Sequence, residues 1–196
     1  MTRSGITLAL CVATAVGGLG LVNRLTQNRV EQTQHKWLSM SLLEVLPPGP
    51  YDNDPLQSQT WIQALELGSK KAMPVYTVYQ QKIPYAAVLS VIAPDGYNGA
   101  IELLMGVHYS GEIVGVRVTR HRETPGLGDD IETRRSQWIY TFEGESLSKP
   151  AAWTVKKQGG KFDSFTGATI TPKAVISAVH RALQWFVSNR DVVFPT

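Results

Sequence analysis

The sequence has few of the side chains that most catalytic and metal-binding sites need. Cys11 is its only cysteine, so the chain can form no internal disulfide and no cysteine-based metal or iron–sulfur site. The four histidines are scattered without ligand spacing, and we therefore predict no metal site. The absence of a G-x-x-x-x-G-K-[ST] motif excludes a nucleotide-triphosphate loop of that type, and the absence of a G-x-S-x-G elbow argues against a serine hydrolase.

Charge of one sign is also scarce, because 19 basic residues face 16 acidic ones and the net charge is only +3. No long run of lysine and arginine alternates with aromatic residues, so the sequence predicts no nucleic-acid partner. Apolar residues make up 43% of the chain, which is enough for a hydrophobic core. A length of 196 residues fits one domain with an appendage.

The appendage is the N-terminus, where the segment from Ile6 to Val22 contains no charged residue. As a helix it would be roughly 26 Å long, close to the thickness of the hydrocarbon core of a membrane. We predict a short tail at residues 1–5 and an uncleaved transmembrane helix at residues 6–23. Two alternatives are a signal peptide cleaved at Ala13–Ala15 and a buried helix of a soluble protein. The apolar segment continues past that cleavage site and is rich in glycine, as membrane helices are, so the pattern favours the anchor.

Beyond the apolar segment, the hydrophobic spacing predicts further helix over residues 24–45, followed by a proline-rich stop and a loop. We treat residues 24–70 as a connector and residues 71–196 as the folded domain of the chain. Short segments rich in β-branched and aromatic residues predict four strands, at residues 74–80, 85–92, 100–109 and 112–119.

The rest of the domain is predicted to contain a helix through Arg135 and Ile139, a strand at residues 153–157, and a last helix from Pro172 to about Val187. Tight turns between the first four strands indicate antiparallel pairing. The predicted fold class is therefore α+β: a single N-terminal transmembrane helix followed by a mostly antiparallel sheet with flanking helices.

The segment FDSFTGATITP precedes the last predicted helix and places small residues between threonines. Thr171 followed by Pro172 has the pattern of a helix N-cap and first residue. A helix start attracts anions, so the hydroxyl of Thr169, two residues earlier, could hold a phosphate covalently there. Gly167 and Ala168 leave room for a large group or a modifying enzyme to approach. The alternative, which the residues alone leave open, is a plain turn and helix cap.

The segment ETPGLGDD, from Glu123 to Asp130, is the second notable motif. Its glycines do not match a dinucleotide-binding fingerprint, because the position of the third glycine is occupied by Ile131. One interpretation is a structural loop with its acidic side chains in solvent. The other is a wall of bare backbone that lets a flat ring approach closely, because glycine has no side chain.

Together, HRETPGLGDDIE and D-x-x-T-G-A-T-x-T-P, after a single N-terminal apolar segment, resemble the RnfG (also called RsxG) subunit of Rnf-type ion-translocating oxidoreductase complexes. The flavin-binding domain of that family is shared with the C subunit of the sodium-pumping NADH:quinone oxidoreductase. The resemblance covers nearly the whole chain and includes APDGYNGAIELL and the last helix. The short chain favours the Rnf family over its relative.

The resemblance implies covalent FMN, joined through a phosphoester bond to Thr169. It also implies that an ApbE-type flavin transferase installs the FMN from FAD and recognises Asp163. The remaining residues that the resemblance assigns to the flavinylation motif are Thr166, Gly167, Ala168 and Thr171. The turn expected beside the flavin ring consists of Glu123, Thr124, Pro125, Gly126, Leu127 and Gly128. Thr169 then needs no base of its own, because another enzyme makes the bond.

The function implied by the resemblance is electron transfer within a membrane-bound complex that links NADH and ferredoxin, as a redox subunit and not a stand-alone enzyme. Its implied partners are other membrane subunits, the transferase and membrane lipid. The implied location is the inner membrane, single-pass, with the soluble domain in the periplasm; flanking charges do not decide this orientation. The alternatives are the C subunit of the sodium-pumping enzyme and a non-redox, membrane-anchored binding or scaffold protein.

Overall fold

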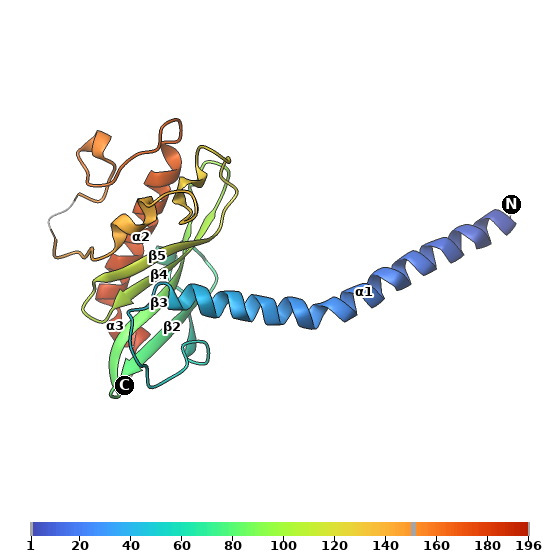
Figure 1. Cartoon of the computed structure of the whole chain (residues 1–196), viewed down its shortest axis with the longest axis horizontal. Coiled ribbons are helices and arrows are strands. Elements are labelled where there is room, and N and C mark those ends of the chain that lie inside the picture. The colour runs from blue at the N-terminus through green and yellow to red at the C-terminus, as the bar shows by residue number, and fades with distance from the viewer. Residues whose placement is uncertain (1, 150–151, 196) are drawn as a thin grey trace. The chain divides into compact units, whose positions relative to one another are not determined.

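A computed structural model describes residues 2–149 and 152–195, with side chains of the N-terminal helix described at residues 5, 6, 12–20, 26, 33 and from 36 onward. The chain divides into two compact units, Met1–Met40 and Ser41–Thr196. The first unit is helical throughout its described residues, as part of α1 (Thr2–Leu43). The second contains the sheet, two further α-helices and several short 3-10 helices (Figure 1).

The sheet is a meander in which each strand pairs with the next in antiparallel fashion. Its strands are β1 (Gln59–Ile62), β2 (Met73–Gln80), β3 (Ile83–Ala93), β4 (Ile101–His108) and β5 (Ile113–Arg120). The central strands β3 and β4 are buried along most of their length, which explains why they read as nearly continuous apolar segments. The four predicted strands and the α+β class are confirmed.

Helix α2 (Ile170–Ser188) covers one face of this sheet, and the short α3 (Arg190–Val193) follows it (Figure 1). The buried face of α2 includes Val175, Val179 and Phe186, at the spacing of one helical face. These side chains pack with Leu89, Met105 and other strand residues in one hydrophobic core. The burial of this face fixes the position of α2, and therefore of the loop that enters it.

The other face of the sheet is partly covered by the end of α1 and the residues that follow it. Leu42, Val45 and Leu46 are buried, and Gly106 in the middle of β4 permits this contact. A Cβ atom at Gly106 would lie only 1.7 Å from the backbone oxygen of Val45, so no larger residue fits there without a shift. The segment that enters the domain is therefore closely packed on the sheet.

The predicted transmembrane helix at residues 6–23 lies within α1. Residues 7–11 and 21–23 of that span have side chains outside the described residues. Within the part of the chain that the structure describes, no helix is both long enough and apolar enough to cross a membrane. The described side chains at residues 12–20 are exposed.

Three local features differ from the prediction. Strand β1 was not predicted, because it buries only Ile62 and so lacks a clear alternating pattern. The helix predicted through Arg135 and Ile139 is a short 3-10 helix at Trp138–Phe142, which buries its apolar residues within one tight turn. The strand predicted at residues 153–157 is reduced to a single bridge between Val155 and Phe162, and the pairing does not continue along the described chain on either side.

His180 on α2 stacks on Trp153, with ring centroids 4.9 Å apart and planes 4° from parallel. Burial lowers the pKa of His180 from its ordinary value of 6.5. The unfolded chain therefore binds this proton first, and the free energy of unfolding should decrease as the pH falls from 7 through 6.5 towards the lowered pKa. Chemical denaturation at several pH values, with NMR titration of the ring, measures the effect. His180→Phe keeps an aromatic ring but cannot bind a proton, so this part of the pH dependence should disappear; an unchanged dependence would contradict the assignment.

Candidate functional site

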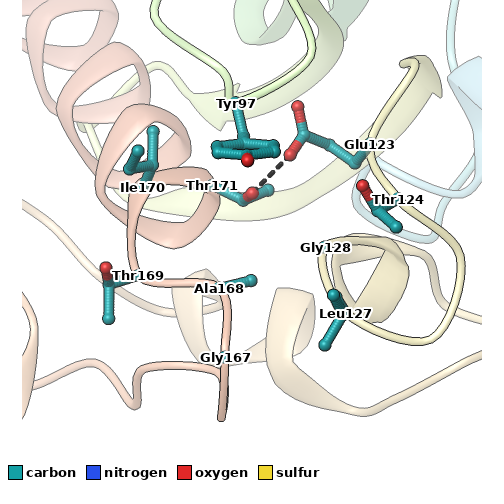
Figure 2. Close-up of a pocket in the computed structure, with 10 residues that line it drawn as sticks. All are labelled: Tyr97, Glu123, Thr124, Leu127, Gly128, Gly167, Ala168, Thr169, Ile170 and Thr171. Atoms are coloured by element: carbon teal, nitrogen blue, oxygen red, sulfur yellow. Dashed lines mark hydrogen bonds between the residues drawn. The ribbon is translucent and has the colours of Figure 1, made fainter.

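A cavity of about 460 Å³ lies where the two motifs of the sequence meet (Figure 2). Three segments form it: the turn between β3 and β4, the loop after β5, and the loop that leads into α2. The lining residues are Tyr97, Glu123, Thr124, Leu127, Gly128, Gly167, Ala168, Thr169, Ile170 and Thr171. Two motifs that are separate in sequence therefore line one cavity.

The helix that carries the threonine motif begins earlier than predicted. Helix α2 starts at Ile170, so Thr169 occupies the N-cap position and Thr171 lies in the first turn. The prediction of Thr171 as N-cap was therefore wrong, because Pro172 is accommodated within the first turn, where no intrahelical N–H partner is needed. The side chain of Thr169 makes no capping hydrogen bond and is exposed, so its hydroxyl is accessible beside the free N–H groups of the helix start.

Gly167 gives the preceding loop its shape. Its φ of 82° lies in the left-handed region, which glycine adopts without steric penalty. The chain turns here, with the N–H of Ala168 donating to the carbonyl of Phe165 at 3.4 Å. A Cβ at Gly167 would lie 3.1 Å from Leu127, so the loop before α2 lies against the loop after β5 at this point.

Thr171 is completely buried, and its hydroxyl donates to Oε2 of Glu123 (Figure 2). The other carboxylate oxygen of Glu123 accepts the backbone N–H of Asn98 at 3.1 Å. Glu123 is itself only 5% exposed, so a carboxylate that one interpretation placed in solvent is buried against the cavity. Both of its carboxylate oxygens accept hydrogen bonds. Glu123 thus joins all three segments that form the cavity.

Two glycines make room for this carboxylate. A Cβ at Gly128 would lie 2.9 Å from Oε2 of Glu123, and a Cβ at Gly96 would lie 2.9 Å from Oε1. Both distances are shorter than a Cβ contact can be, so any larger residue would displace the carboxylate. Gly128 is therefore required by packing around Glu123, in addition to the cavity that it lines.

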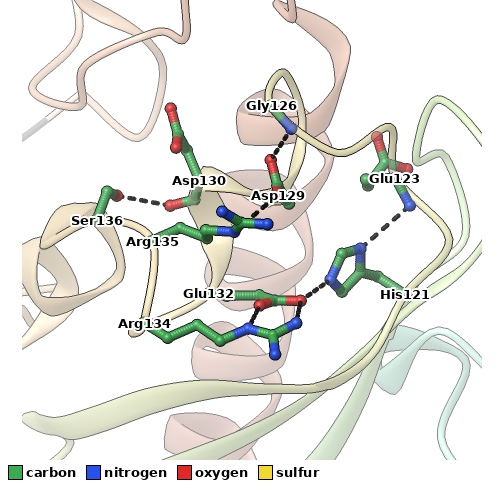
Figure 3. Close-up of polar contacts among 9 residues, drawn as sticks. All are labelled: His121, Glu123, Gly126, Asp129, Asp130, Glu132, Arg134, Arg135 and Ser136. Carbon is green, nitrogen blue, oxygen red and sulfur yellow. Dashed lines mark hydrogen bonds and ion pairs between the residues drawn. The ribbon is translucent and has the colours of Figure 1, made fainter.

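The loop after β5 is held by a second buried carboxylate, Asp129 (Figure 3). Its Oδ1 accepts the backbone N–H of Gly126 at 2.7 Å, and its Oδ2 lies 2.9 Å from the Nε of Arg135. Gly126 has a φ of 78°, which again favours glycine. The N–H of Gly128 donates to the carbonyl of Thr124 at 3.0 Å and closes the turn. The loop that presents Leu127 is therefore braced from inside.

His121 extends this bracing away from the cavity (Figure 3). Its Nδ1 accepts the backbone N–H of Glu123 at 3.1 Å, and its Nε2 lies 2.6 Å from Oε1 of Glu132. Hydrogen bonding from Arg134 and from His121 holds the pKa of the Glu132 carboxyl below its usual range, with Arg134 the larger contribution. His121 does not line the cavity, so we assign it a positioning role.

Asp163 lies outside the cavity and is exposed. Its carboxylate is 2.8 Å from the Nζ of Lys156, and its backbone carbonyl accepts the indole N–H of Trp138 at 2.8 Å. Thr166, Pro125 and Gly126 also do not line the cavity. The position of Asp163 on the surface beside the threonine loop suits contact with another protein better than contact with a ligand in the cavity.

Two lining residues were not predicted, Tyr97 and Ile170. Tyr97 lies in the turn PDGYNG, whose polar and glycine-rich sequence indicated only a turn. An aromatic residue at the tip of such a turn was the available signal. Ile170 gave none, because an apolar residue before a helix is usual.

The cavity has the chemical character that a phosphorylated flat ring requires. Its volume is within the usual range of cofactor sites, roughly 300–1,000 Å³. Its walls combine the apolar side chains of Tyr97, Leu127 and Ile170 with the hydroxyl of Thr169 at a helix N-terminus, where a phosphate is favoured. The described residues include no group of three or more His, Cys, Asp or Glu side chains that could hold a metal ion.

Comparison with known proteins identifies the class of this site. Residues 96–184, which contain all the lining residues, match the family model described as an FMN-binding domain. The chain thus contains a domain that matches the FMN-binding family.

Whole-chain comparison identifies the family. The chain is 47% identical over 194 residues to the G subunit of the ion-translocating oxidoreductase complex of Pseudomonas aeruginosa, covering 97% of this chain and 91% of that protein. It is 48% identical to the protein of the same name from Photorhabdus laumondii (92% and 88% covered) and 41% identical to that from Shewanella oneidensis (99% and 93% covered). The chain therefore belongs to the family of G subunits of ion-translocating oxidoreductase complexes, and the predicted resemblance is confirmed. A crystal structure of Shewanella oneidensis NqrC aligns with a TM-score of 0.48 and 21% identity, covering 74% of this chain and 70% of the other.

Proposed function

We propose that this protein is a membrane-anchored electron-transfer subunit of an Rnf-type ion-translocating oxidoreductase complex, with FMN joined to Thr169 by a phosphoester bond. Residues 6–23 anchor it in the inner membrane, among lipid and the other membrane subunits, and the FMN-binding domain faces the periplasm. The name of its relatives, which describes a subunit of an ion-translocating complex, supports assembly with such partners. FMN supplies the electron-transfer chemistry when bound, and the protein supplies its position and surroundings.

One observation carries the covalent part of the proposal. Thr169 presents an exposed hydroxyl, free of any capping hydrogen bond, at the N-terminus of α2 and on the wall of the cavity. The helix start favours an anion by about 0.3–1 kcal/mol, which orients a phosphate without driving bond formation. The described cavity lining contains no histidine or cysteine, and both oxygens of Glu123 already accept hydrogen bonds, which suits a bond made by a separate transferase.

The proposed transfer of FMN to Thr169 is a displacement at phosphorus. The Thr169 oxygen forms a bond to the phosphorus of the FMN part of FAD, the pyrophosphate bond breaks, and AMP leaves. The hydroxyl proton passes to the transferase or to water. Because Thr169 is exposed and Gly167 and Ala168 are small, the transferase can reach the oxygen on the folded domain.

The test of this function is the intact mass of the full-length chain, co-expressed with an exported flavin transferase and measured after denaturation. Added FMN, less water, on the peptide that contains Thr169 supports the proposal. An unmodified mass, with a control substrate fully flavinylated, would mean that the threonine segment is only a turn and helix cap. It would then favour a scaffold function. Colour that is lost on denaturation would indicate noncovalent FMN. Extraction of the cell membranes at alkaline pH tests the anchor, which predicts that the chain stays with the lipid.

Replacement of Asp163 by alanine should slow flavinylation severalfold or more and leave the fold intact. The reason is that Asp163 is exposed beside the threonine loop, where the transferase is proposed to recognise it. The measurement is the rate of flavin incorporation, followed by fluorescence of the denatured chain, with circular dichroism to check the fold.

Lys156→Ala is the matched control, because it removes the same ion pair from the other side. An exposed pair of this kind contributes about 0–1 kcal/mol, so this variant should fold and be flavinylated normally. Equal slowing in both variants would assign the effect to the ion pair, and full loading of Asp163→Ala would remove the recognition role.

A further inference from the structure

Tyr97 is the only aromatic residue among the described residues that line the cavity, and it lies outside the two motifs to which the sequence analysis assigned site residues. Its side chain is 66% exposed, although it lies at the cavity wall. Single exposed aromatic residues are common on proteins, so exposure alone means little. What distinguishes Tyr97 is the set of contacts that fixes its turn.

The turn that carries Tyr97 is tied to the loop after β5 on both sides of the tyrosine. The backbone N–H of Asn98 donates to Oε1 of Glu123 at 3.1 Å, and the Asn98 side-chain amide donates to Oγ1 of Thr124 at 3.0 Å. On the other side, Gly96 lies so close to Glu123 that no Cβ fits between them. The turn is also closed by a hydrogen bond from the Gly99 N–H to the Gly96 carbonyl at 3.4 Å. These contacts hold the turn, and with it Tyr97, at the wall of the cavity.

Leu127 provides apolar surface on another side of the same cavity. Its side chain is 43% exposed and comes from the loop after β5, whereas Tyr97 comes from the turn between β3 and β4 (Figure 2). Ile170, 47% exposed, adds a third apolar side chain at the start of α2. The exposed large apolar residues at this site therefore surround a space that adjoins the Thr169 hydroxyl.

We propose that the ring of Tyr97 stacks on the isoalloxazine ring of FMN and forms the aromatic wall of its site. This inference rests on the proposed function, because it requires FMN on Thr169. Offset stacking between flat aromatic systems adds to the free energy gained from burial alone and fixes the ring's orientation. Asn98, through Glu123 and Thr124, acts as the positioning residue for Tyr97. A phenol ring in contact with a flavin also quenches its fluorescence, which makes the contact measurable without any turnover.

The experiment uses the full-length chain, flavinylated as above, and compares flavin fluorescence before and after denaturation of the same sample. This ratio cancels differences in flavin load. The wild-type ratio should be low, and Tyr97→Ala should raise it severalfold. Tyr97→Leu, which keeps an apolar side chain, should raise it equally and serves if the alanine variant folds poorly. Tyr97→Phe keeps a stacking face, so its visible circular dichroism should stay close to that of the wild type.

Tyr109→Ala is the matched control, because Tyr109 is 42% exposed but does not line the cavity. Its fluorescence ratio should equal that of the wild type. Asn98→Ala should raise the ratio by less than Tyr97→Ala, because only one of the contacts that hold the turn is lost. If both Tyr97→Ala and Tyr97→Leu carry flavin with the wild-type ratio and circular dichroism, the stacking proposal is wrong while the covalent site stands. A wild-type chain without flavin would overturn the proposed function first.

Discussion

Thr169→Ala should carry no covalent flavin at all, whereas the wild-type chain expressed with the same transferase should be fully loaded. The effect is complete because the substitution removes the oxygen that forms the proposed phosphoester bond. Neighbouring hydroxyls do not replace it. Thr171 is fully buried and bonded to Glu123, and Thr166 lies outside the cavity. In-gel fluorescence of the denatured chain, followed by intact mass, measures the loss.

Two variants separate loss of the attachment atom from damage to the loop. Thr169→Ser keeps a hydroxyl at the N-cap position and should still be flavinylated. The rate of flavinylation should fall if the transferase contacts the methyl group of Thr169. Thr166→Ala removes an exposed hydroxyl of the flavinylation motif but keeps the attachment oxygen, so any flavin that it carries should still be found on Thr169. Full flavin loading of Thr169→Ala would place the bond elsewhere and contradict the proposal.

The sheet and α2 could be predicted because their signals are local. Strands β2 to β5 are short segments rich in β-branched and apolar residues and separated by turn residues, and the buried side chains of α2 recur at helical spacing. Strand β1 was not predicted, because an edge strand with one buried residue shows no alternation of apolar and polar residues. The 3-10 helix at Trp138–Phe142 was misread because its apolar spacing also fits the first turn of an α-helix.

The candidate site was predictable as two motifs but not as one cavity. The sequence places Glu123 and Thr171 forty-eight positions apart, and no local pattern shows that their side chains meet. The start of α2 at Ile170 was also not predictable, because Thr171-Pro172 matches the pattern of an N-cap and first helical residue at least as well as Thr169-Ile170 does. The physical reason for the difference is the buried hydrogen bond to Glu123, which draws Thr171 into the protein and leaves Thr169 at the helix end.

Glu123→Ala should lower the free energy of unfolding of the full-length chain by about 2–3 kcal/mol. The substitution leaves the buried Thr171 hydroxyl without its acceptor, and a buried polar group left unpaired costs about 1–3 kcal/mol. The Asn98 N–H also loses its acceptor, but Asn98 is exposed and water can take that place. For a domain of this size the midpoint of thermal unfolding should fall by roughly 5–10 °C. Thermal and denaturant unfolding of the flavin-free chain measure the change, so that flavin binding does not contribute.

Two further substitutions decide whether the effect comes from Glu123 as the group that joins the three cavity segments. Glu123→Gln keeps the volume and one acceptor oxygen and should lose about 1 kcal/mol. Asp130→Ala is a control in the same loop. The Asp130 carboxylate points away from the other side chains drawn in Figure 3. This substitution should therefore change the free energy of unfolding by no more than about 0.5 kcal/mol. Since Glu123 also holds the turn of Asn98, the alanine variant, once flavinylated, should show the raised fluorescence ratio of the Tyr97 variants. Wild-type stability in Glu123→Ala would mean that water replaces the carboxylate, and that the cavity is held together by packing of the loops alone.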